Sequence, residues 1–303
     1  MNQHSPLRSA SLIERAAELY GFDAPPAAPA RAPEPAPEPE IVARAPEKAR
    51  AEPKPAPRIS GPAVAIDRSR LRSAALIEPD APVGALAEEF RIVKRQLLLN
   101  ASAATDLPPE KKRVILLCSA QPGEGKTFCA LNLALSLSGE KDVEVLLVDG
   151  DFPKPDVMTQ LGIEPGAGLV DAIADPLLDP ESLVQRTDLP GLSVLPAGRQ
   201  ADNVTELLAS ERTRDVFRRL SEAVPNRLII IDSPPALLAS PASVLAGLAG
   251  QLVMVVRADK TNEAELRDAL ELLSGCERVS LLLNAAGFAA GGRRFGAYYG
   301  YGQ

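Results

Sequence analysis

The sequence is short of the side chains that most often carry catalysis or bind metals. In 303 residues it has no tryptophan, a single histidine, His4, and three cysteines. One histidine excludes histidine-rich metal sites and catalytic pairs that need two histidines. The cysteines, Cys118, Cys129 and Cys276, lack the spacing of a metal site or a disulfide framework, so we expect a reducing compartment.

Long apolar runs and an excess of positive charge are also missing. No apolar stretch reaches the roughly 18 residues that a membrane-spanning helix needs, and the N-terminus lacks the apolar region of a signal peptide. The net charge is −7, which argues against a general nucleic-acid-binding surface. We therefore expect a cytoplasmic protein whose contact with a membrane comes through a partner or a surface.

Tyrosine is scarce, and its placement is unusual. The chain has four tyrosines, and three of them, Tyr298, Tyr299 and Tyr301, fall in the final segment "GGRRFGAYYGYGQ". Glycine flanks them and no apolar periodicity surrounds them, so they cannot build a core, where a tyrosine ring normally packs. Two interpretations remain: an adhesive tail, or hydroxyl groups that something must reach.

Composition divides the chain into four parts. Residues 1–22 contain a short amphipathic helix, with Ser11 and Glu14 in a capping-box pattern. Residues 23–82 are rich in proline and alanine, with twelve of the 29 prolines between Pro25 and Pro62, and are expected to be a disordered linker. A folded domain is expected over 83–290, followed by a flexible tyrosine-rich tail over 291–303.

Strand-like apolar runs alternate with helical patterns inside the predicted domain. A continuous apolar strand flanked by helices is typical of a parallel sheet that is covered on both faces. The sequence therefore predicts an α/β fold, doubly wound, with a mostly parallel sheet. Ligands bind such folds beyond the carboxyl ends of the strands. The strand-like runs are 113–120, 143–150, 192–198, 227–235, 251–258 and 279–287.

A phosphate-binding loop follows the first run, in "AQPGEGKT". Gly123 and Gly125 allow backbone N–H groups to turn toward phosphate oxygens at a helix N-terminus. Lys126 is placed for the terminal phosphates of ATP and the Thr127 hydroxyl for Mg²⁺. Asn284 ends the last strand, where its amide is either a contact for the base or a simple turn residue. The predicted nucleotide-binding residues are Gln121, Pro122, Gly123, Glu124, Gly125, Lys126, Thr127, Phe128 and Asn284.

Carboxylates follow two other strands. Asp149 and Asp151 come after the second run, and Asp232 ends the apolar stretch of "IIIDSPP". Carboxyl ends of parallel strands share one edge, so these groups are expected beside the phosphate loop as a Mg²⁺ site, with Thr127, Asp151 and Asp232 as ligands. The alternative for any one of them is a helix cap.

The segment "LLVDGDFPKPDV", with "AQPGEGKT" and "IIIDSPP", resembles the three nucleotide motifs of bacterial protein-tyrosine kinases, a group within the MinD/ParA-like P-loop ATPases. The resemblance covers about residues 86–303, although Pro153 stands where the family often has arginine. The segment "EEFRIVKRQLLLN" is similar to the family's oligomerisation helix, which implies subunit contacts through Glu88, Arg91 and Lys94. The final tyrosines resemble its autophosphorylation cluster, which implies that Tyr298, Tyr299 and Tyr301 are phosphate acceptors.

The resemblance implies a tyrosine autokinase that acts in trans within a homo-oligomeric ring. The variant associated with exopolysaccharide synthesis and exosortase systems is the most similar, through the segment "SLIERAAEL" and the proline-rich linker. Such a kinase is cytoplasmic and peripheral to the inner membrane. Its partner there is a separate membrane protein that determines polysaccharide chain length, and no nucleic acid is involved.

The residues suggest roles for phosphoryl transfer and leave two alternatives. Lys126 and Mg²⁺ would neutralise the γ-phosphate, Asp232 would hold the metal through water, and Asp149 and Asp151 would orient or deprotonate the phenol. One alternative is a MinD/ParA-like ATPase without kinase activity, but that group has a signature lysine where this chain has Gln121. The other is a nucleotide-sensing regulatory scaffold.

Overall fold

A seven-stranded sheet forms the centre of the computed structural model, which describes residues 62–287. The strand order is β3-β4-β2-β5-β1-β6-β7, and every neighbouring pair is parallel except β3 and β4. The predicted doubly wound α/β fold is confirmed. The strands are β1 (Val114–Ser119), β2 (Glu144–Asp149), β3 (Gln185–Arg186), β4 (Leu192–Leu195), β5 (Arg227–Asp232), β6 (Gln251–Arg257) and β7 (Val279–Asn284).

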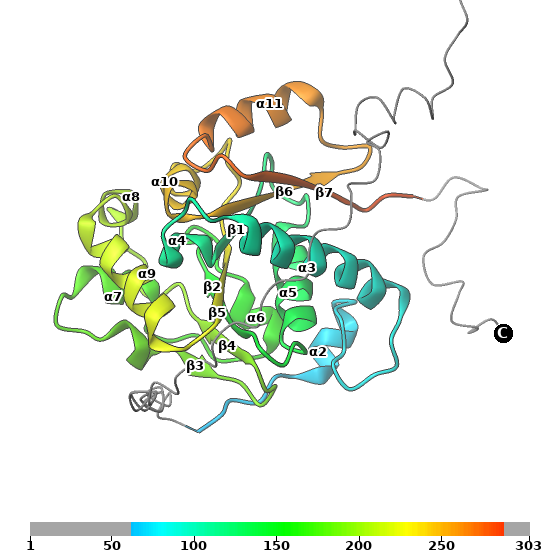
Figure 1. The fold of residues 1–303 in the computed structure, drawn as a ribbon, viewed down its shortest axis with the longest axis horizontal. Coiled ribbons are helices and arrows are strands. Elements are labelled where there is room, and N and C mark those ends of the chain that lie inside the picture. The colour runs from blue at the N-terminus through cyan, green and yellow to red at the C-terminus, as the bar shows by residue number, and fades with distance from the viewer. Residues whose placement is uncertain (1–61, 288–303) are drawn as a thin grey trace, which may run out of the picture. The chain divides into compact units, whose positions relative to one another are not determined.

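Helices cover the sheet on both faces (Figure 1). One face carries α2 (Arg68–Ser73), α3 (Ala85–Ala103), α5 (Lys126–Leu137) and α6 (Val157–Leu161). The other carries α7 (Leu169–Ala174), α8 (Val204–Leu208), α9 (Glu211–Ala223), α10 (Pro241–Leu248) and α11 (Glu263–Leu272). The short helix α4 (Pro109–Lys112) leads into β1, and the 3₁₀ turn η1 (Pro180–Leu183) leads into β3.

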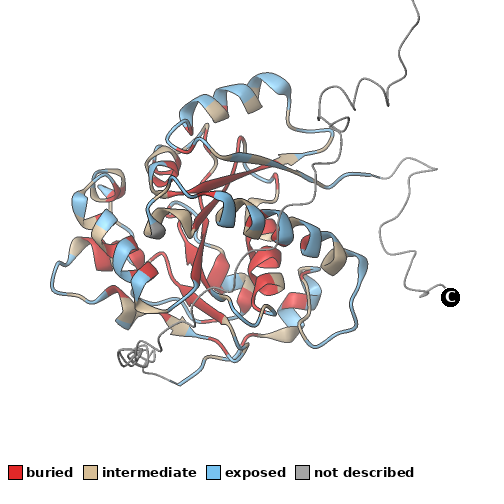
Figure 2. Cartoon of the chain, in the orientation of Figure 1, coloured by how far each residue is buried: buried red, intermediate tan, exposed pale blue. Residues whose placement is uncertain are grey.

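The strands explain why the sequence reads as continuous apolar runs. In β1, Ile115 and Leu117 enter the core beneath α5, whereas Leu116 and Cys118 enter the core on the opposite face. Because both faces are covered there, successive side chains of the inner strands β1, β4 and β5 are all buried, as the red strands of Figure 2 show. The edge strand β7 differs, since its side chains alternate between exposed and partly buried. Cys118 packs as a small core residue, and burial raises the pKa of its thiol to about 11.

The folded part begins before Val83, so the predicted boundary is wrong at this end. Ile66, Leu71 and Leu76 are all buried in the core that contains α5. Asp67 caps α2 by accepting the backbone N–H groups of the first turn. Three apolar side chains spread over eleven residues gave no clear helix or strand period, and packing reveals their role. The predicted N-terminal helix and residues 23–61 of the predicted linker lie outside the described residues.

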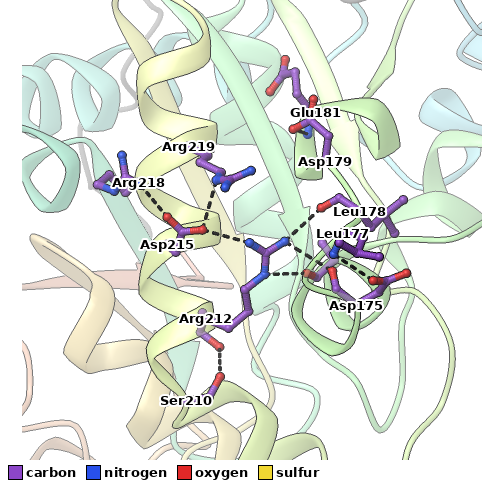
Figure 3. A network of polar contacts seen from close by, with 12 residues as sticks. Asp175, Leu177, Leu178, Asp179, Glu181, Ser210, Arg212, Asp215, Arg218 and Arg219 are labelled. Carbon is purple, nitrogen blue, oxygen red and sulfur yellow. Dashed lines mark hydrogen bonds and ion pairs between the residues drawn. The ribbon is translucent and has the colours of Figure 1, made fainter.

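Two helices, α8 and α9, lie between β4 and β5. Ser210 separates them with an extended backbone, and its hydroxyl donates to Leu207 O at 2.6 Å. From the first turn of α9, the Arg212 guanidinium reaches Leu178 O at 2.9 Å and Asp215 at 2.9 Å (Figure 3). These contacts tie α9 to the loop after α7 and are structural. Along 62–287, no helix combines the length and apolarity that a bilayer crossing requires.

The predicted oligomerisation residues do not share one face of α3. Glu88 and Arg91 form an ion pair on the exposed side of the helix. Lys94 lies instead on the buried side with Phe90 and Leu97, and its Nζ is 2.8 Å from both Ser136 O and a Glu140 oxygen. Six residues correspond to about 600° of rotation, which places Lys94 roughly 120° away from Glu88. Lys94 therefore fastens α3 to the end of α5.

Candidate functional site

The phosphate loop joins β1 to α5 with the backbone that the sequence predicts. Gly123 and Gly125 have positive φ angles of 74° and 95°, which residues with a side chain rarely adopt. Gly125 is also needed for space, because a Cβ there would lie 2.1 Å from Asn284 Nδ2. Helix α5 begins at Lys126, so its free N–H groups and its dipole face the loop.

Lys126 and the Thr127 hydroxyl each contact one of the aspartates predicted for the site. Lys126 Nζ is 2.5 Å from Asp151 Oδ2, and the two side chains are only 11% and 7% exposed. The Thr127 hydroxyl donates to Asp232 Oδ2 at 2.7 Å. Burial opposes the charge on Lys126, but Asp232 and Asp151 raise its pKa. The ammonium group is therefore held charged at the edge of the sheet.

Asp149 and Asp232 are direct neighbours on β2 and β5. Both are fully buried, and each has one carboxylate oxygen, Oδ1, without a hydrogen-bond partner. Burial, reinforced by the charge of Asp232, raises the pKa of Asp149 to about 7. Burial also raises the pKa of Asp232 to about 6, although Lys126 opposes the shift. Gly150 permits this packing, since a Cβ there would lie 2.8 Å from Asp232 O.

The structure separates the roles of the two aspartates in "DGD". Asp149 has no exposed surface, and its Oδ2 accepts the Val157 N–H at 3.1 Å, at the start of α6. Asp149 thus holds the start of α6, whereas Asp151 contacts Lys126.

A magnesium ion fits these residues only together with phosphate and water. Between residues 62 and 287, no group of three or more His, Cys, Asp or Glu side chains is arranged to hold a metal by itself. The unpartnered oxygen of Asp232 and its contact with the Thr127 hydroxyl nevertheless supply hard oxygen ligands beside the phosphate loop. Mg²⁺ usually takes one or two carboxylates and completes its shell with phosphate and water.

Other predicted nucleotide-binding residues form contacts that support the loop. The Asn284 amide donates to Glu124 O at 2.9 Å, so one of its two N–H bonds is used by the loop. Glu124 is fully buried and accepts the Gln121 N–H at 2.8 Å. The Phe128 ring packs against the core on the α5 side. Gln121 is held on α11 through Glu265, at 3.2 Å.

Several residues of the site escaped the sequence analysis. They follow β6, the strand beside β1, in "RADKT". Arg257 Nη1 donates to Gly123 O at 2.7 Å and Lys260 Nζ to Pro122 O at 2.9 Å. Thr261 donates its hydroxyl to the Glu124 carboxylate. Their signal was positional, because residues after a strand next to the phosphate loop must border that loop. The predicted acceptors, Tyr298, Tyr299 and Tyr301, lie outside the described residues.

Known proteins are similar to this chain in sequence and in fold. The chain is 30% identical over 198 residues to tyrosine-protein kinase YwqD of Bacillus subtilis (strain 168), which covers 65% of this chain and 78% of YwqD. The chain belongs to the bacterial tyrosine-protein kinase family. The solved BceF tyrosine kinase domain matches 64% of this chain and 76% of its own, with 28% identity and a TM-score of 0.54.

Longer relatives match only in part. The succinoglycan biosynthesis transport protein ExoP of Rhizobium meliloti (strain 1021) is 32% identical over 216 residues, which is 68% of this chain but 25% of ExoP. The chain likewise spans about a quarter of the length of several other curated relatives. No protein-family model matches the chain.

Proposed function

We propose that this chain is an ATP-dependent protein-tyrosine kinase that phosphorylates its own tyrosine-rich segment in trans and regulates exopolysaccharide synthesis or export. The observation that carries the proposal is the pairing of Lys126 with Asp151 beside the Thr127–Asp232 contact, at one edge of the sheet. This edge holds a charged lysine for phosphates and a carboxylate for the acceptor within one site. Membership of the kinase family and the name of ExoP agree with it.

Phosphoryl transfer depends mainly on positioning and on neutralising charge. Lys126 would leave Asp151 to contact the terminal phosphates, while Thr127 and Asp232, with Asp151, would hold Mg²⁺. The metal, when bound, neutralises phosphate charge. Asp151 would also accept a hydrogen bond from the phenol, whose pKa of about 10 otherwise disfavours its loss of a proton. Asp149 holds the start of α6 and keeps the strand end fixed.

The direct test is incubation of the full chain with Mg-ATP after phosphatase treatment. We expect the intact mass to rise by whole phosphoryl groups, and peptide mapping should place them on Tyr298, Tyr299 and Tyr301. The reaction should be measured with and without the cytosolic segment of a candidate membrane chain-length protein, which we propose as the partner that brings the kinase to the inner membrane. ATP binding without any gain in mass, under both conditions, would contradict kinase activity.

A MinD/ParA-like ATPase is the second candidate, and one contact counts against it. At the position of that group's signature lysine the chain has Gln121, whose side chain is bound to Glu265 on α11. The Gln121 side chain carries no charge, unlike the signature lysine. Hydrolysis of ATP without phosphotyrosine would favour this alternative, and binding without hydrolysis would favour a regulatory scaffold.

We also propose that the exposed side of α3 contributes to a homo-oligomer, as a ring or a smaller assembly. Ile92 and Leu99 lie one heptad apart there and are 51% and 64% exposed, near the Glu88–Arg91 pair. We expect Glu88→Ala with Arg91→Ala to shift sedimentation toward smaller species in the presence of ATP and the partner. The reason is the loss of charges that border exposed apolar side chains.

A matched control for α3 is available on α9. Arg218→Ala with Glu222→Ala also removes an exposed ion pair one turn apart, and it should leave sedimentation unchanged. Lys94→Met is expected to lower thermal stability instead, because Lys94 bonds within its own chain. An unchanged profile for the Glu88 and Arg91 variant would argue that this side of α3 is only a solvated surface.

A further inference from the structure

Side chains from the end of β6, from the residues after it and from the end of β7 bind three successive carbonyl groups of the phosphate loop. Lys260 Nζ donates to Pro122 O at 2.9 Å, Arg257 Nη1 to Gly123 O at 2.7 Å, and Asn284 Nδ2 to Glu124 O at 2.9 Å. We call Lys260, Arg257 and Asn284 the carbonyl belt. Two of its members are cations.

The belt fixes the direction of the N–H groups as well. A planar trans peptide points its N–H opposite to its C=O, and the described chain contains no cis peptide. The carbonyls of Pro122, Gly123 and Glu124 share their peptide groups with the N–H groups of Gly123, Glu124 and Gly125. With each carbonyl bound on the outside, these N–H groups must face the opposite side, where phosphate oxygens bind in such loops.

Further contacts join the residues around the belt to the phosphate loop. Thr261 donates its hydroxyl to the buried Glu124 carboxylate, which also accepts the Gln121 N–H. Gly123 leaves room for the belt, since a Cβ there would meet Lys260 Nζ at 3.4 Å. The segment after β6 thus contacts the loop at Pro122, Gly123 and Glu124.

We propose that Lys260 and Arg257 are positioning residues for ATP, which act on the phosphates through the peptide groups of the loop and not by touching the nucleotide. A cation at a carbonyl oxygen polarises the peptide and makes its N–H a stronger donor, because hydrogen bonds to charged groups are the stronger ones. The proposal rests on nucleotide binding at this loop, which is part of the proposed function.

Calorimetric titration of the full chain with ADP and with tripolyphosphate tests the proposal. Both cations are exposed on the surface, so each should contribute about one ordinary hydrogen bond. We expect Lys260→Gln and Arg257→Gln each to lower the affinity for ADP by about threefold to tenfold, and the affinity for tripolyphosphate by the same factor. Arg257→Lys keeps the charge and should restore part of the loss. Arg267→Gln is the matched control, since Arg267 carries the same charge on α11 and, among the described residues, pairs with Glu263.

Equal losses for the two ligands, absent in Arg267→Gln, would support the belt. A loss for ADP alone would overturn it and indicate a contact with the base. An equal loss in Arg267→Gln would overturn it in favour of long-range attraction, and unchanged affinities would overturn it outright. If the wild-type protein binds neither ADP nor tripolyphosphate, both the proposed function and the proposed role of the belt are refuted. If the wild-type protein binds both ligands and the variants bind them equally well, only the role of the belt is refuted.

Discussion

Lys126→Met is expected to abolish phosphorylation of the chain and to weaken ATP binding severely. The ammonium group is the buried cation of the site, held at Asp151 and close to Asp232. Methionine keeps roughly the length of the side chain and removes the positive charge that offsets Asp151 and Asp232 beside the terminal phosphates. A single cation that stabilises phosphoryl transfer contributes roughly a thousandfold or more to the rate. Phosphotyrosine measured by intact mass should therefore fall below detection.

Lys141→Met provides the matched control. Lys141 is exposed and precedes β2, at the opposite end of the strands from the phosphate loop. The substitution changes net charge equally and should leave phosphorylation unaltered. Thermal unfolding of both variants without nucleotide separates loss of function from loss of fold. Near-wild-type phosphorylation by folded Lys126→Met protein would refute the assignment of the active site.

Asp151→Asn should affect nucleotide binding and phosphoryl transfer differently. Asp151 is ion-paired with Lys126, so removing the charge of Asp151 should release Lys126 toward phosphate. Without Mg²⁺, we expect ADP affinity to stay constant or to rise, while the rate of phosphoryl transfer with Mg-ATP falls. Lys126→Met, in contrast, should reduce both the affinity for ADP and the rate of phosphoryl transfer. A parallel decline in ADP affinity for Asp151→Asn would mean that Asp151 shapes the loop and does not serve the acceptor.

The sequence was most informative where its signals are local. The apolar run ending at Asp232 predicted a strand covered on both faces, and the glycines of "PGEGKT" predicted the positive φ angles found at Gly123 and Gly125. The common edge of parallel strands also placed Asp151 near Lys126 without any knowledge of the ion pair between them. These inferences need only short-range periodicity and the rule that parallel strands end at one edge.

What the sequence could not show depends on contacts between distant segments. Arg257 lies 134 positions from Gly123, and only the adjacency of β1 and β6 brings them together. Leu71 looks like an isolated apolar residue after a proline-rich stretch, yet it has no exposed surface once α2 packs. Lys94 was assigned to a subunit contact because its residue type fits the family pattern. Its burial is decided by the rotation of α3 about its axis.

The tyrosine-rich segment gives the second large expected effect. We predict that Tyr298, Tyr299 and Tyr301 receive phosphate from a neighbouring subunit. A Lys126→Met chain that keeps its tyrosines should be mixed with an active chain lacking residues 292–303. Phosphate should then appear on the inactive chain, at these three positions, and mass spectrometry can locate it. The rate should rise with protein concentration, since two chains must meet.

A control variant removes the three tyrosine hydroxyls and keeps the rest of the chain. In the same mixture, an inactive chain with Tyr298→Phe, Tyr299→Phe and Tyr301→Phe should remain unmodified. If the three-tyrosine tail also stays unmodified when the membrane partner is present, and the active chain is labelled only elsewhere, then the segment is not the substrate. The kinase proposal would then lose its main sequence support.

The described part of the chain sets the distance that transfer within one chain would have to cross. The last strand is β7, whereas Asp151 follows β2, four strand positions away across β5, β1 and β6. At about 4.8 Å per strand, that separation is roughly 19 Å. Tyr298 lies 14 residues beyond Asn284, a span of at most about 50 Å, so length alone permits a return to its own site. The mixture decides between the two routes: full-length wild-type chains would label themselves by either, but only transfer in trans can place phosphate on a chain that lacks Lys126.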